Sequence, residues 1–358
     1  MQSMSNSRIL RRVDPFPFVP RDTAIRDKRC EEIFSIQTTG LKRRLTHVAQ
    51  RLGKDQFPVS IGVSGGLDSA LALLVVVRAF DRLGWDRKNI LAVTMPGFGT
   101  TDRTYRNATS LIKEAKASLR EISIKDAVLG HCRDIGHEFH RSGCARCQNI
   151  QARERTQILM NLAFTIGTGD LSELALGWCT YNGDHMAMYN PNADIPKTLV
   201  RFVVRRTADR DDVPQPLRAV LYDILDTPIS PELEERSDAT SGMQETEHII
   251  GPYELHDFFL YYMLRFGFSS GKILFLAECA NANSPGEGFS HAYTHQEIIR
   301  WLIGFYTRFG DNQFKRDAMP NGPKVGSVAL SPRGDWRMPS DIELSLWIDQ
   351  LNSLIGTV

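Results

Sequence analysis

The sequence predicts an α/β protein built on a doubly wound parallel sheet, with helices on both faces and a helical C-terminal extension. Short apolar runs rich in β-branched residues recur at 59–63, 89–96 and 119–124. Stretches with apolar residues at helical spacing lie between them. No linker or internal repeat divides the chain. Alternating strands and helices in one undivided chain are typical of a parallel sheet that binds ligands at the carboxyl ends of its strands.

The first third of the chain contains the clearest elements. Residues 1–13 are expected to form a flexible leader, and residues 14–20 are too rich in proline for a helix, so they should lie extended across the surface. Residues 26–52 have the apolar spacing of a helix packed on the sheet. The strand 59–63 then leads through a glycine turn into a buried helix that includes residues 70–77.

The middle of the chain continues the alternation. After the strand 89–96 we expect a helix at 102–117, a third strand at 119–124 and a helix at 148–163. Polar loops at 180–184 and 190–198 should precede another amphipathic helix.

The last third is less regular. Acidic and small polar runs between 205 and 251, including 237–242, are compatible with a mobile flap. Residues 254–268 predict a strongly apolar helix in the core or at a subunit interface. The tail 313–340 is expected to be a basic loop.

Composition excludes several classes of protein. The chain has 358 residues, 42% apolar and 24% charged, with a net charge of +1. This balance argues against a protein that coats nucleic acid, and no apolar run is long enough to span a membrane. The N-terminus has no hydrophobic signal region. Six cysteines in a chain of this length do not form a disulfide scaffold, so we expect a reducing cytoplasm.

The most informative stretch is Ser-Gly-Gly-Leu-Asp-Ser at 64–69, between a strand and a helix. Such a turn directs backbone N–H groups and the positive end of a helix dipole at one point, which suits phosphate. Gly65 and Gly66 would let the backbone approach an anion, and Ser64 and Ser69 add hydroxyl donors. Asp68 repels phosphate unless a divalent cation bridges the two, so the stretch predicts Mg-nucleotide binding. The alternative, an ordinary glycine turn, is disfavoured by the combination of residues.

Two further stretches are candidates for the same site. Residues 167–178 form a second glycine turn into a helix, with Asp170 and Glu173 in its first turn. On their own, these acidic residues are better explained as favourable partners of the helix dipole. Residues 95–101 close the second strand, where a nucleotide base would lie in such a fold.

The pair Cys144 and Cys147, in Cys-x-x-Cys spacing with His137 and His140 upstream, is open to two interpretations. It could bind zinc. The His pair is a weak signal, so unpaired surface or semi-buried thiols are favoured.

Together these segments resemble the synthetase domain of glutamine-dependent NAD synthetase, a member of the ATP pyrophosphatase (PP-loop) superfamily with an adenine-nucleotide α-hydrolase-like fold. The resemblance covers most of the chain, from residue 14 to 341. Its most specific pieces are 64–69, 148–156 and 167–178, supported by 190–198 and 314–316. The phosphate loop alone is shared with GMP synthetase, asparagine synthetase and tRNA-thiolating enzymes; the other segments select the NAD branch.

The resemblance implies a ligase that amidates nicotinic acid adenine dinucleotide. ATP adenylylates the pyridine carboxylate and pyrophosphate leaves, then ammonia displaces AMP to give NAD+; Mg²⁺ is the implied cofactor. Relatives assemble as dimers or larger, and the apolar helices near 71–80 and 254–268 could serve such an interface. The alternatives are a non-catalytic nucleotide-binding remnant and another PP-loop enzyme, such as one that modifies tRNA. The balanced charge argues against the latter.

The resemblance also assigns residues by position. The implied catalytic residues are Asp68, Glu173 and Lys197, with Asp68 and Glu173 as magnesium ligands. The positions that match ATP contacts are Ser64, Gly65, Gly66, Leu67, Asp68, Ser69, Met95, Thr168, Lys197 and Ser230. The positions that match deamido-NAD contacts are Asn149, Arg153, Glu173, Trp178, Cys179, Thr180, Tyr181, Asp184 and Lys315.

The chain departs from this family in two respects. Glutamine-dependent relatives carry an N-terminal nitrilase-like glutaminase domain, and nothing before Asp14 could be that domain. We therefore expect residues 14–358 to form a synthetase domain that uses free ammonia or a separate glutaminase, or that is excised from a longer enzyme. In addition, residues 159–167 are several residues shorter than in relatives, so the helix should run into the next strand without a turn residue. This shortening is expected to affect the packing behind Thr168.

Overall fold

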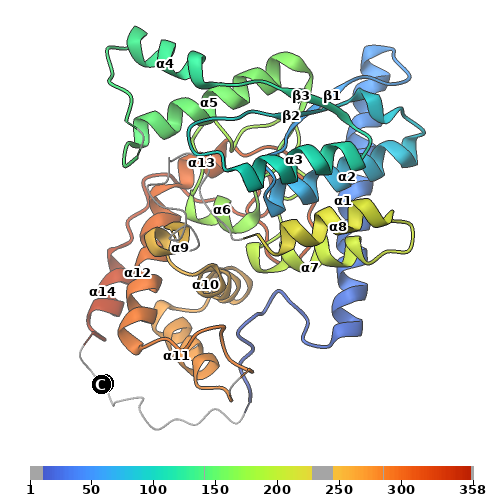
Figure 1. Ribbon diagram of the computed structural model, residues 1–358. Coiled ribbons are helices and arrows are strands. Elements are labelled where there is room, and N and C mark those ends of the chain that lie inside the picture. Colours follow the sequence, from blue (N-terminus) through green and yellow to red (C-terminus); the bar gives the residue numbers. More distant parts are fainter. Residues whose placement is uncertain (1–10, 141, 228–244, 285, 356–358) are drawn as a thin grey trace.

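A parallel four-stranded sheet lies at the centre of the protein (Figure 1). The computed structural model describes residues 11–140, 142–227, 245–284 and 286–355. The strands are β1 (Val59–Gly62), β2 (Ile90–Thr94), β3 (Ser118–Glu121) and β4 (Phe164–Ile166), in the order β3-β2-β1-β4. Val59 pairs with Ile90 on one side and with Phe164 on the other. The predicted doubly wound α/β fold is confirmed.

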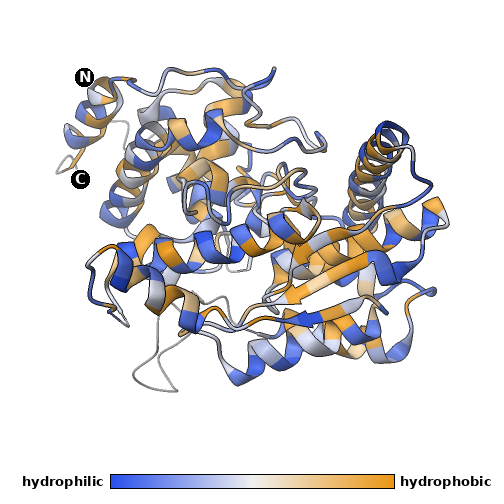
Figure 2. Ribbon diagram, turned by 90° about the horizontal axis from the view of Figure 1, so that it is seen from above, coloured by the Kyte–Doolittle hydropathy of each residue, from blue (hydrophilic) through white to orange (hydrophobic). Residues whose placement is uncertain are grey.

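The central strands are apolar because both of their faces are covered. Every described residue of β1 and β2 is buried or half-buried, whereas β3 lies at the sheet edge and three of its four residues are exposed. Figure 2 shows the inner strands as apolar and hydrophilic residues on the outer helix surfaces. The predicted third strand, 119–124, is displaced: β3 ends at Glu121, and the chain turns into a helix after Ile124. Strands buried on both faces are typical of parallel sheets.

Helices cover both faces of the sheet (Figure 1). The helices α4 (Lys125–Asp134) and α5 (Ala145–Leu162) lie on one face, and α2 (Leu67–Leu83) and α3 (Asp102–Glu114) on the other. Behind α2 and α3 lie α1 (Thr23–Leu52), α7 (Lys197–Ala208) and α8 (Gln215–Leu225). A short 3₁₀ turn, η1 (Arg87–Asn89), precedes β2. All residues from Ser69 to Val77 are buried, which explains the continuous apolar run in the sequence.

The C-terminal part forms a second helical layer with its own apolar core. It contains α9 (Glu245–Ile250), α10 (Tyr253–Phe266), α11 (Ser270–Asn281), α12 (His295–Asp311) and α14 (Ser345–Asn352). The short helices α6 (Leu171–Leu176) and α13 (Gln313–Asp317) lie between this layer and the sheet (Figure 1). Phe258, Phe259 and Phe305 are completely buried in this core. None of the helices in the described ranges has the length and apolar character that crossing a membrane requires.

Several expectations are corrected by burial. The apolar residues of α2 and most of those of α10 are buried within this chain, so these faces are not free to form a subunit interface. Val13, expected in a flexible leader, is 4% exposed, and Arg12 pairs with Glu287 at 2.7 Å. Pro15 and Val19 are buried rather than spread across the surface.

Two other regions are more structured than the sequence indicated. The polar region 205–251 contains α8, whose apolar face packs against α7, and the predicted flap at 237–242 lies outside the described residues. The tail 313–340 begins with α13, and its residue Arg316 is fully buried rather than part of an exposed basic loop.

Candidate active site

The strand order brings two distant loops together. Because β4 pairs with β1 and not with β3, the loop 63–66 after β1 lies beside the loop 167–170 after β4. Helices α2 and α6 begin directly after these loops. A position where the winding direction of a parallel sheet reverses is the usual ligand site in such folds.

The loop after β1, residues 63–66, is called the phosphate loop below because it is predicted to bind phosphate. Its glycines and its own serines determine its shape. Gly65 has a φ of +91°, and a Cβ at this position would lie 2.1 Å from the carbonyl oxygen of Thr104, so only glycine fits. The Oγ of Ser64 accepts a hydrogen bond from the backbone N–H of Gly66 at 3.2 Å, and the Oγ of Ser69 lies 3.2 Å from that of Ser64. Within the part of the chain that the structure describes, no side chain caps the N-terminus of α2, which leaves that end of the helix suited to an anion.

A lysine and three carboxylates meet beside this loop. The Nζ of Lys197, the first residue of α7, lies 2.7 Å from Asp68 Oδ2, 2.6 Å from Asp170 Oδ2 and 2.9 Å from Glu173 Oε1. The side chain of Lys197 is 5% exposed, and that of Asp170 is inaccessible to solvent. These four residues are called the lysine–carboxylate cluster below. The structure therefore brings together all three of the predicted catalytic residues, Asp68, Glu173 and Lys197.

The electrostatics of this cluster favour an additional cation. Burial raises the pKa of Asp170 well above its usual value and also raises that of Glu173, and neighbouring carboxylates act in the same direction. Burial alone would lower the pKa of Lys197, but Asp170, Asp68 and Glu173 raise it well above its usual value, so the ammonium stays charged. One lysine cannot balance three carboxylates.

The cluster also has the donor atoms that a divalent cation needs. Asp68, Asp170 and Glu173 each offer a carboxylate oxygen, and these oxygens lie within 4.8 Å of one another. The Oδ1 of Asp68 is buried and has no hydrogen-bond partner among the described residues. Hard carboxylate oxygens with an unused buried acceptor fit Mg²⁺.

Asp170 is the member that the sequence did not identify. Its Oδ1 accepts a hydrogen bond from the backbone N–H of Glu173 at 2.8 Å, which is the helix-capping role expected from its position. Its Oδ2 faces Lys197 at the same time. The position of Asp170 next to the end of β4, at the switch point, is the signal that could have identified its second role.

Buried polar side chains hold the cluster in place. Asn192 donates from Nδ2 to the carbonyl oxygens of Asp68 at 2.9 Å and Thr168 at 3.3 Å, so it joins the two loops directly. Gln37 of α1 donates to Asn192 Oδ1 at 3.0 Å. The contacts of Asn192 with Asp68 and with Gln37 each span more than a hundred residues of sequence, and no local pattern predicts them.

Asp257 of α10 holds the first turns of α6 and α7, which carry Glu173 and Lys197 of the cluster. Its carboxylate accepts hydrogen bonds from the hydroxyl of Ser172, from the backbone N–H of Thr198 at 3.0 Å and from the hydroxyl of Thr198 at 2.7 Å. The Oγ of Ser172 in turn accepts the backbone N–H of Lys197 at 2.8 Å. The first turns of α6 and α7 are thereby fixed to each other and to α10.

A pocket of about 290 Å³ opens at the carboxyl ends of the strands. Seven of the predicted site residues line it: Ser64, Asp68, Ser69, Met95, Thr168, Glu173 and Asp184. Arg155, Thr156 and Leu159 of α5 line it as well, and they were not predicted. We call it the strand-end pocket.

The shortened segment before Thr168 lies behind this pocket. A single residue, Ala163, separates α5 from β4, as the sequence predicted. The hydroxyl of Ser60 in β1 donates to the carbonyl oxygen of Leu159 at 2.8 Å, so the end of α5 is held against the sheet. The strand-end pocket is present despite the short junction.

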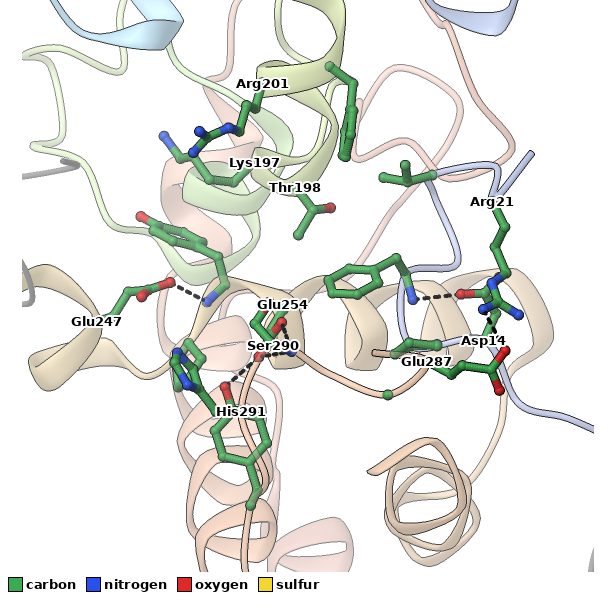
Figure 3. A pocket seen from close by; sticks show the side chains of 18 of the residues that line it. Asp14, Arg21, Lys197, Thr198, Arg201, Glu247, Glu254, Glu287, Ser290 and His291 are labelled. Atoms are coloured by element: carbon green, nitrogen blue, oxygen red, sulfur yellow. Dashed lines mark hydrogen bonds and ion pairs between the residues drawn. The ribbon is translucent and has the colours of Figure 1, made fainter. Parts of the chain in front are cut away.

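A larger pocket of about 820 Å³ lies on the other side of the cluster. Leu67 and Lys197 line this pocket, whereas Asp68 and Glu173, which contact Lys197, line the strand-end pocket. Figure 3 shows Lys197 and Arg201 of α7 along one side and Glu254 opposite. The lysine–carboxylate cluster thus lies between two cavities.

The residues predicted to hold the deamido-dinucleotide gather around the loop 177–185. The hydroxyl of Thr180 donates to Asn149 Oδ1 at 2.8 Å, and the backbone N–H of Thr180 donates to Asp184 Oδ1 at 2.8 Å. The Nε of Arg153 donates to the carbonyl oxygen of Tyr181 at 3.2 Å. Lys315 donates from Nζ to the carbonyl oxygens of Gly177 and Cys179 at 2.6 and 2.8 Å.

This loop is continuous with the cluster. The backbone N–H of Trp178 donates to the carbonyl oxygen of Glu173 at 2.9 Å, so both groups are attached to α6. Burial raises the pKa of Cys179 far above its usual value, which makes this thiol a poor nucleophile. Ser230, predicted to contact ATP, lies outside the described residues.

Comparison with known proteins agrees with this geometry. The family model described as NAD synthase matches residues 41–250, more than half of the chain. The chain belongs to the NAD synthase family. The resemblance inferred from the motifs is confirmed, and the matched residues include the phosphate loop and all four residues of the lysine–carboxylate cluster.

Curated members of the NAD synthase family match over almost the whole chain. The glutamine-dependent NAD(+) synthetase of Mycobacterium leprae (strain TN) is 44% identical over 367 residues, which cover 97% of this chain and 53% of that protein. The enzyme of the same name from Mycobacterium tuberculosis (strain H37Rv) is 42% identical over 364 residues, covering 96% and 52%. The chain therefore spans about half the length of these relatives.

The fold is also shared with a solved structure of a family member. The glutamine-dependent NAD(+) synthetase from Cytophaga hutchinsonii superposes with a TM-score of 0.67 at 17% identity, covering 91% of this chain and 56% of that chain. At this identity the likeness concerns the fold alone.

Proposed function

We propose that this chain catalyses the ATP-dependent amidation of nicotinic acid adenine dinucleotide, giving NAD+, AMP and pyrophosphate with ammonia as the nitrogen donor. The observation that carries the proposal is the lysine–carboxylate cluster at the switch point of a chain that belongs to the NAD synthase family. Membership of that family and the names of the mycobacterial relatives support NAD+ as the product.

The phosphate loop and Lys197 would bind the triphosphate and offset its negative charge. The N-terminus of α2 and the hydroxyls of Ser64 and Ser69 would bind the β and γ phosphates. Lys197 is held charged by its neighbours, so it would offset negative charge on the phosphate that is transferred. Asp68, Asp170 and Glu173 would hold Mg²⁺, which when bound screens phosphate charge and acts as a Lewis acid.

The chemistry needs no nucleophilic side chain. A pyridine carboxylate oxygen attacks the α phosphorus of ATP, and the bond to pyrophosphate breaks. Ammonia then attacks the carbonyl carbon of the adenylate, AMP leaves with the electron pair of the broken bond, and the surplus proton passes to solvent. The protein has to position two anionic substrates and exclude water, which the buried cluster between two cavities supports.

Turnover with defined nitrogen sources tests the proposal. The purified chain is incubated with nicotinic acid adenine dinucleotide, ATP and Mg²⁺, and either ammonium or glutamine. We expect NAD+ with equimolar AMP and pyrophosphate from ammonium. Glutamine should become a substrate when a separate glutaminase is added. ATP binding with no NAD+ from either nitrogen source would contradict the proposal and favour a non-catalytic nucleotide-binding protein.

We also propose a homo-oligomer, dimer or larger, that works in the cytoplasm. The six cysteines are free in the structure, which suits a reducing compartment. Sedimentation equilibrium would test the oligomeric state, and a single species at the mass of one chain would contradict it.

A further inference from the structure

A second cluster of ligand side chains lies away from the proposed reaction, in the loop that joins α4 to α5. The Nε2 of His137 lies 3.4 Å from the Sγ of Cys144 and 3.4 Å from the Sγ of Cys147. The three ligand atoms all lie within 4.8 Å of one another. The Cys-x-x-Cys spacing alone favoured unpaired thiols, because the sequence could not show that one imidazole faces both sulfurs.

These distances match a tetrahedral zinc site. With Zn–N and Zn–S bonds of the usual lengths, a nitrogen and a sulfur on neighbouring corners lie about 3.6 Å apart. The two observed distances of 3.4 Å are close to this value. One metal ion could therefore bind all three atoms with little movement of the backbone.

Backbone donors around the sulfurs favour thiolates. The backbone N–H of Cys147 donates to Cys144 Sγ at 3.5 Å, and the backbone N–H of His140 donates to Cys147 Sγ at 3.3 Å. A metal cation between the two sulfurs would favour the same ionised state.

We propose that His137, Cys144 and Cys147 bind a zinc ion that closes the loop between α4 and α5. Water or His140, whose exposed ring lies 5.5 Å from that of His137 between centroids, completes the coordination. Two thiolates and an imidazole select a soft metal such as zinc, in contrast to the all-carboxylate cluster at the active site. The two metal sites are chemically distinct.

The consequence of the bound metal is structural. Cys144 is the N-cap of α5, and the next turns of α5 carry Asn149 and Arg153 of the proposed substrate site. From the same loop, Phe139 packs on Phe98 with ring centroids 4.2 Å apart. A zinc ion would fix the start of α5 and thereby the wall that α5 contributes to the strand-end pocket (Figure 1).

Metal analysis of purified protein tests this site without reference to catalysis. Protein produced with zinc in the medium and dialysed against metal-free buffer should retain about one zinc ion per chain. Cys144→Ser and Cys147→Ser should each lower zinc affinity by at least about tenfold, since each removes a direct ligand. Cys279→Ser, which changes a partly buried thiol on α11, is the matched control and should retain the metal.

Cobalt gives a second readout that depends on the ligands. Parent protein stripped of zinc and loaded with Co²⁺ should show thiolate-to-cobalt charge transfer, and both cysteine variants should weaken it. If a variant does not fold, as judged by circular dichroism, the parent protein still tests the site: a chelator removes its metal, and the protein is then reloaded with zinc or cobalt. Less than about a tenth of an equivalent of zinc in the parent, or zinc that is unaffected by both variants, would overturn the proposal. A disulfide between Cys144 and Cys147 in freshly isolated protein without zinc would also overturn it.

Discussion

Lys197 is the cation that all three carboxylates of the lysine–carboxylate cluster share. Its ammonium contacts three carboxylates and lies 5.3 Å from the centre of the Tyr253 ring. Without a bound cation, the cluster of one lysine and three carboxylates would carry a net charge of −2 if all groups were ionised. Burial is the main reason that the pKa values of Asp170 and Glu173 are raised, and repulsion from neighbouring carboxylates adds to it, because a proton on a carboxylate relieves both effects.

Magnesium binding should therefore strengthen as the pH rises. The metal needs ionised carboxylates, and protons compete for Asp170 and Glu173, whose pKa values are raised by burial. We expect affinity to keep increasing at pH values above about 5, where ordinary carboxylates are already ionised. Calorimetry in buffers of different ionisation enthalpy should detect proton release on Mg²⁺ binding. Affinity that is constant from mildly acidic to neutral pH would contradict this explanation.

Asp170→Asn separates the two roles of this residue. The amide oxygen can still accept the N–H of Glu173 and cap α6, but the charge next to Lys197 is lost. We expect turnover to fall about 100-fold, as for other preorganised electrostatic contacts, with little change in thermal stability. The pH dependence of Mg²⁺ affinity should also become shallower.

Asp311→Asn is the control for this variant, since Asp311 is an exposed aspartate at the end of α12. It should behave like the parent protein. Full activity in Asp170→Asn would show that Asp170 only caps the helix.

At the scale of elements, α6 depends on a buried arginine. Arg316 of α13 donates from NH1 to the carbonyl oxygens of Leu174 at 3.3 Å and Ala175 at 2.9 Å, and from NH2 to that of Phe309. It is fully buried, and burial lowers its pKa to about 10. The guanidinium satisfies carbonyl groups that a six-residue helix leaves without partners.

Arg316→Met should destabilise the protein by about 3 kcal/mol, because it leaves buried carbonyl groups without donors. Since α6 also carries Glu173, we expect weaker Mg²⁺ binding in the same variant. Chemical denaturation and Mg²⁺ titration measure the two effects. Arg300→Met, at an exposed arginine of α12, should change neither quantity. A stability equal to that of the parent would mean that water replaces the guanidinium.

The predictability of each element depended on whether its signal was local. The strand, glycine turn and helix around 59–77 have their pattern in consecutive residues, so they were predicted. Helix α8 was missed because its apolar residues are interleaved with polar ones and lie among acidic runs. Arg316 looked like part of an exposed basic tail, since sequence gives the charge of a residue but not its burial.

The site residues were likewise predicted only where their signal lies in a local motif. Asp68, Glu173 and Lys197 were predicted because the resemblance assigns them by motif. The second role of Asp170 and the supporting contacts of Asn192 arise only when β4 pairs with β1. A pairing between segments about a hundred residues apart leaves no mark in a local pattern.

At the scale of the whole molecule, Asp257 connects the helical C-terminal layer to the sheet. It belongs to α10, in the second apolar core, and it binds Ser172 of α6 and Thr198 of α7. The lysine–carboxylate cluster is thus attached to both cores. A shift of the helical C-terminal layer relative to the sheet would therefore displace Lys197.

Asp257→Asn should affect stability and turnover together. The amide nitrogen cannot accept a hydrogen bond, so at least one of the three donors is left unpaired, at a cost of about 2 kcal/mol. We expect turnover to fall about tenfold through displacement of Lys197, with a larger effect on kcat than on the KM for ATP. Urea denaturation and steady-state kinetics measure these changes.

A milder variant and a control accompany Asp257→Asn. Thr198→Val removes one donor to Asp257 and should give a smaller loss of the same kind. Asp349→Asn, at an exposed position on α14, should have no effect. Loss of stability with unchanged kcat would show that Asp257 does not position the lysine.

The order in which the cluster is completed has a consequence for biogenesis. Asp68 and Lys197 are 129 residues apart, so a growing chain presents all three carboxylates before their lysine has been synthesised. Burying those acids against the sheet at that stage would be electrostatically unfavourable. The junction between β1 and β4 should therefore stay open on the ribosome until α7 arrives, unless a cellular cation takes the place of the ammonium.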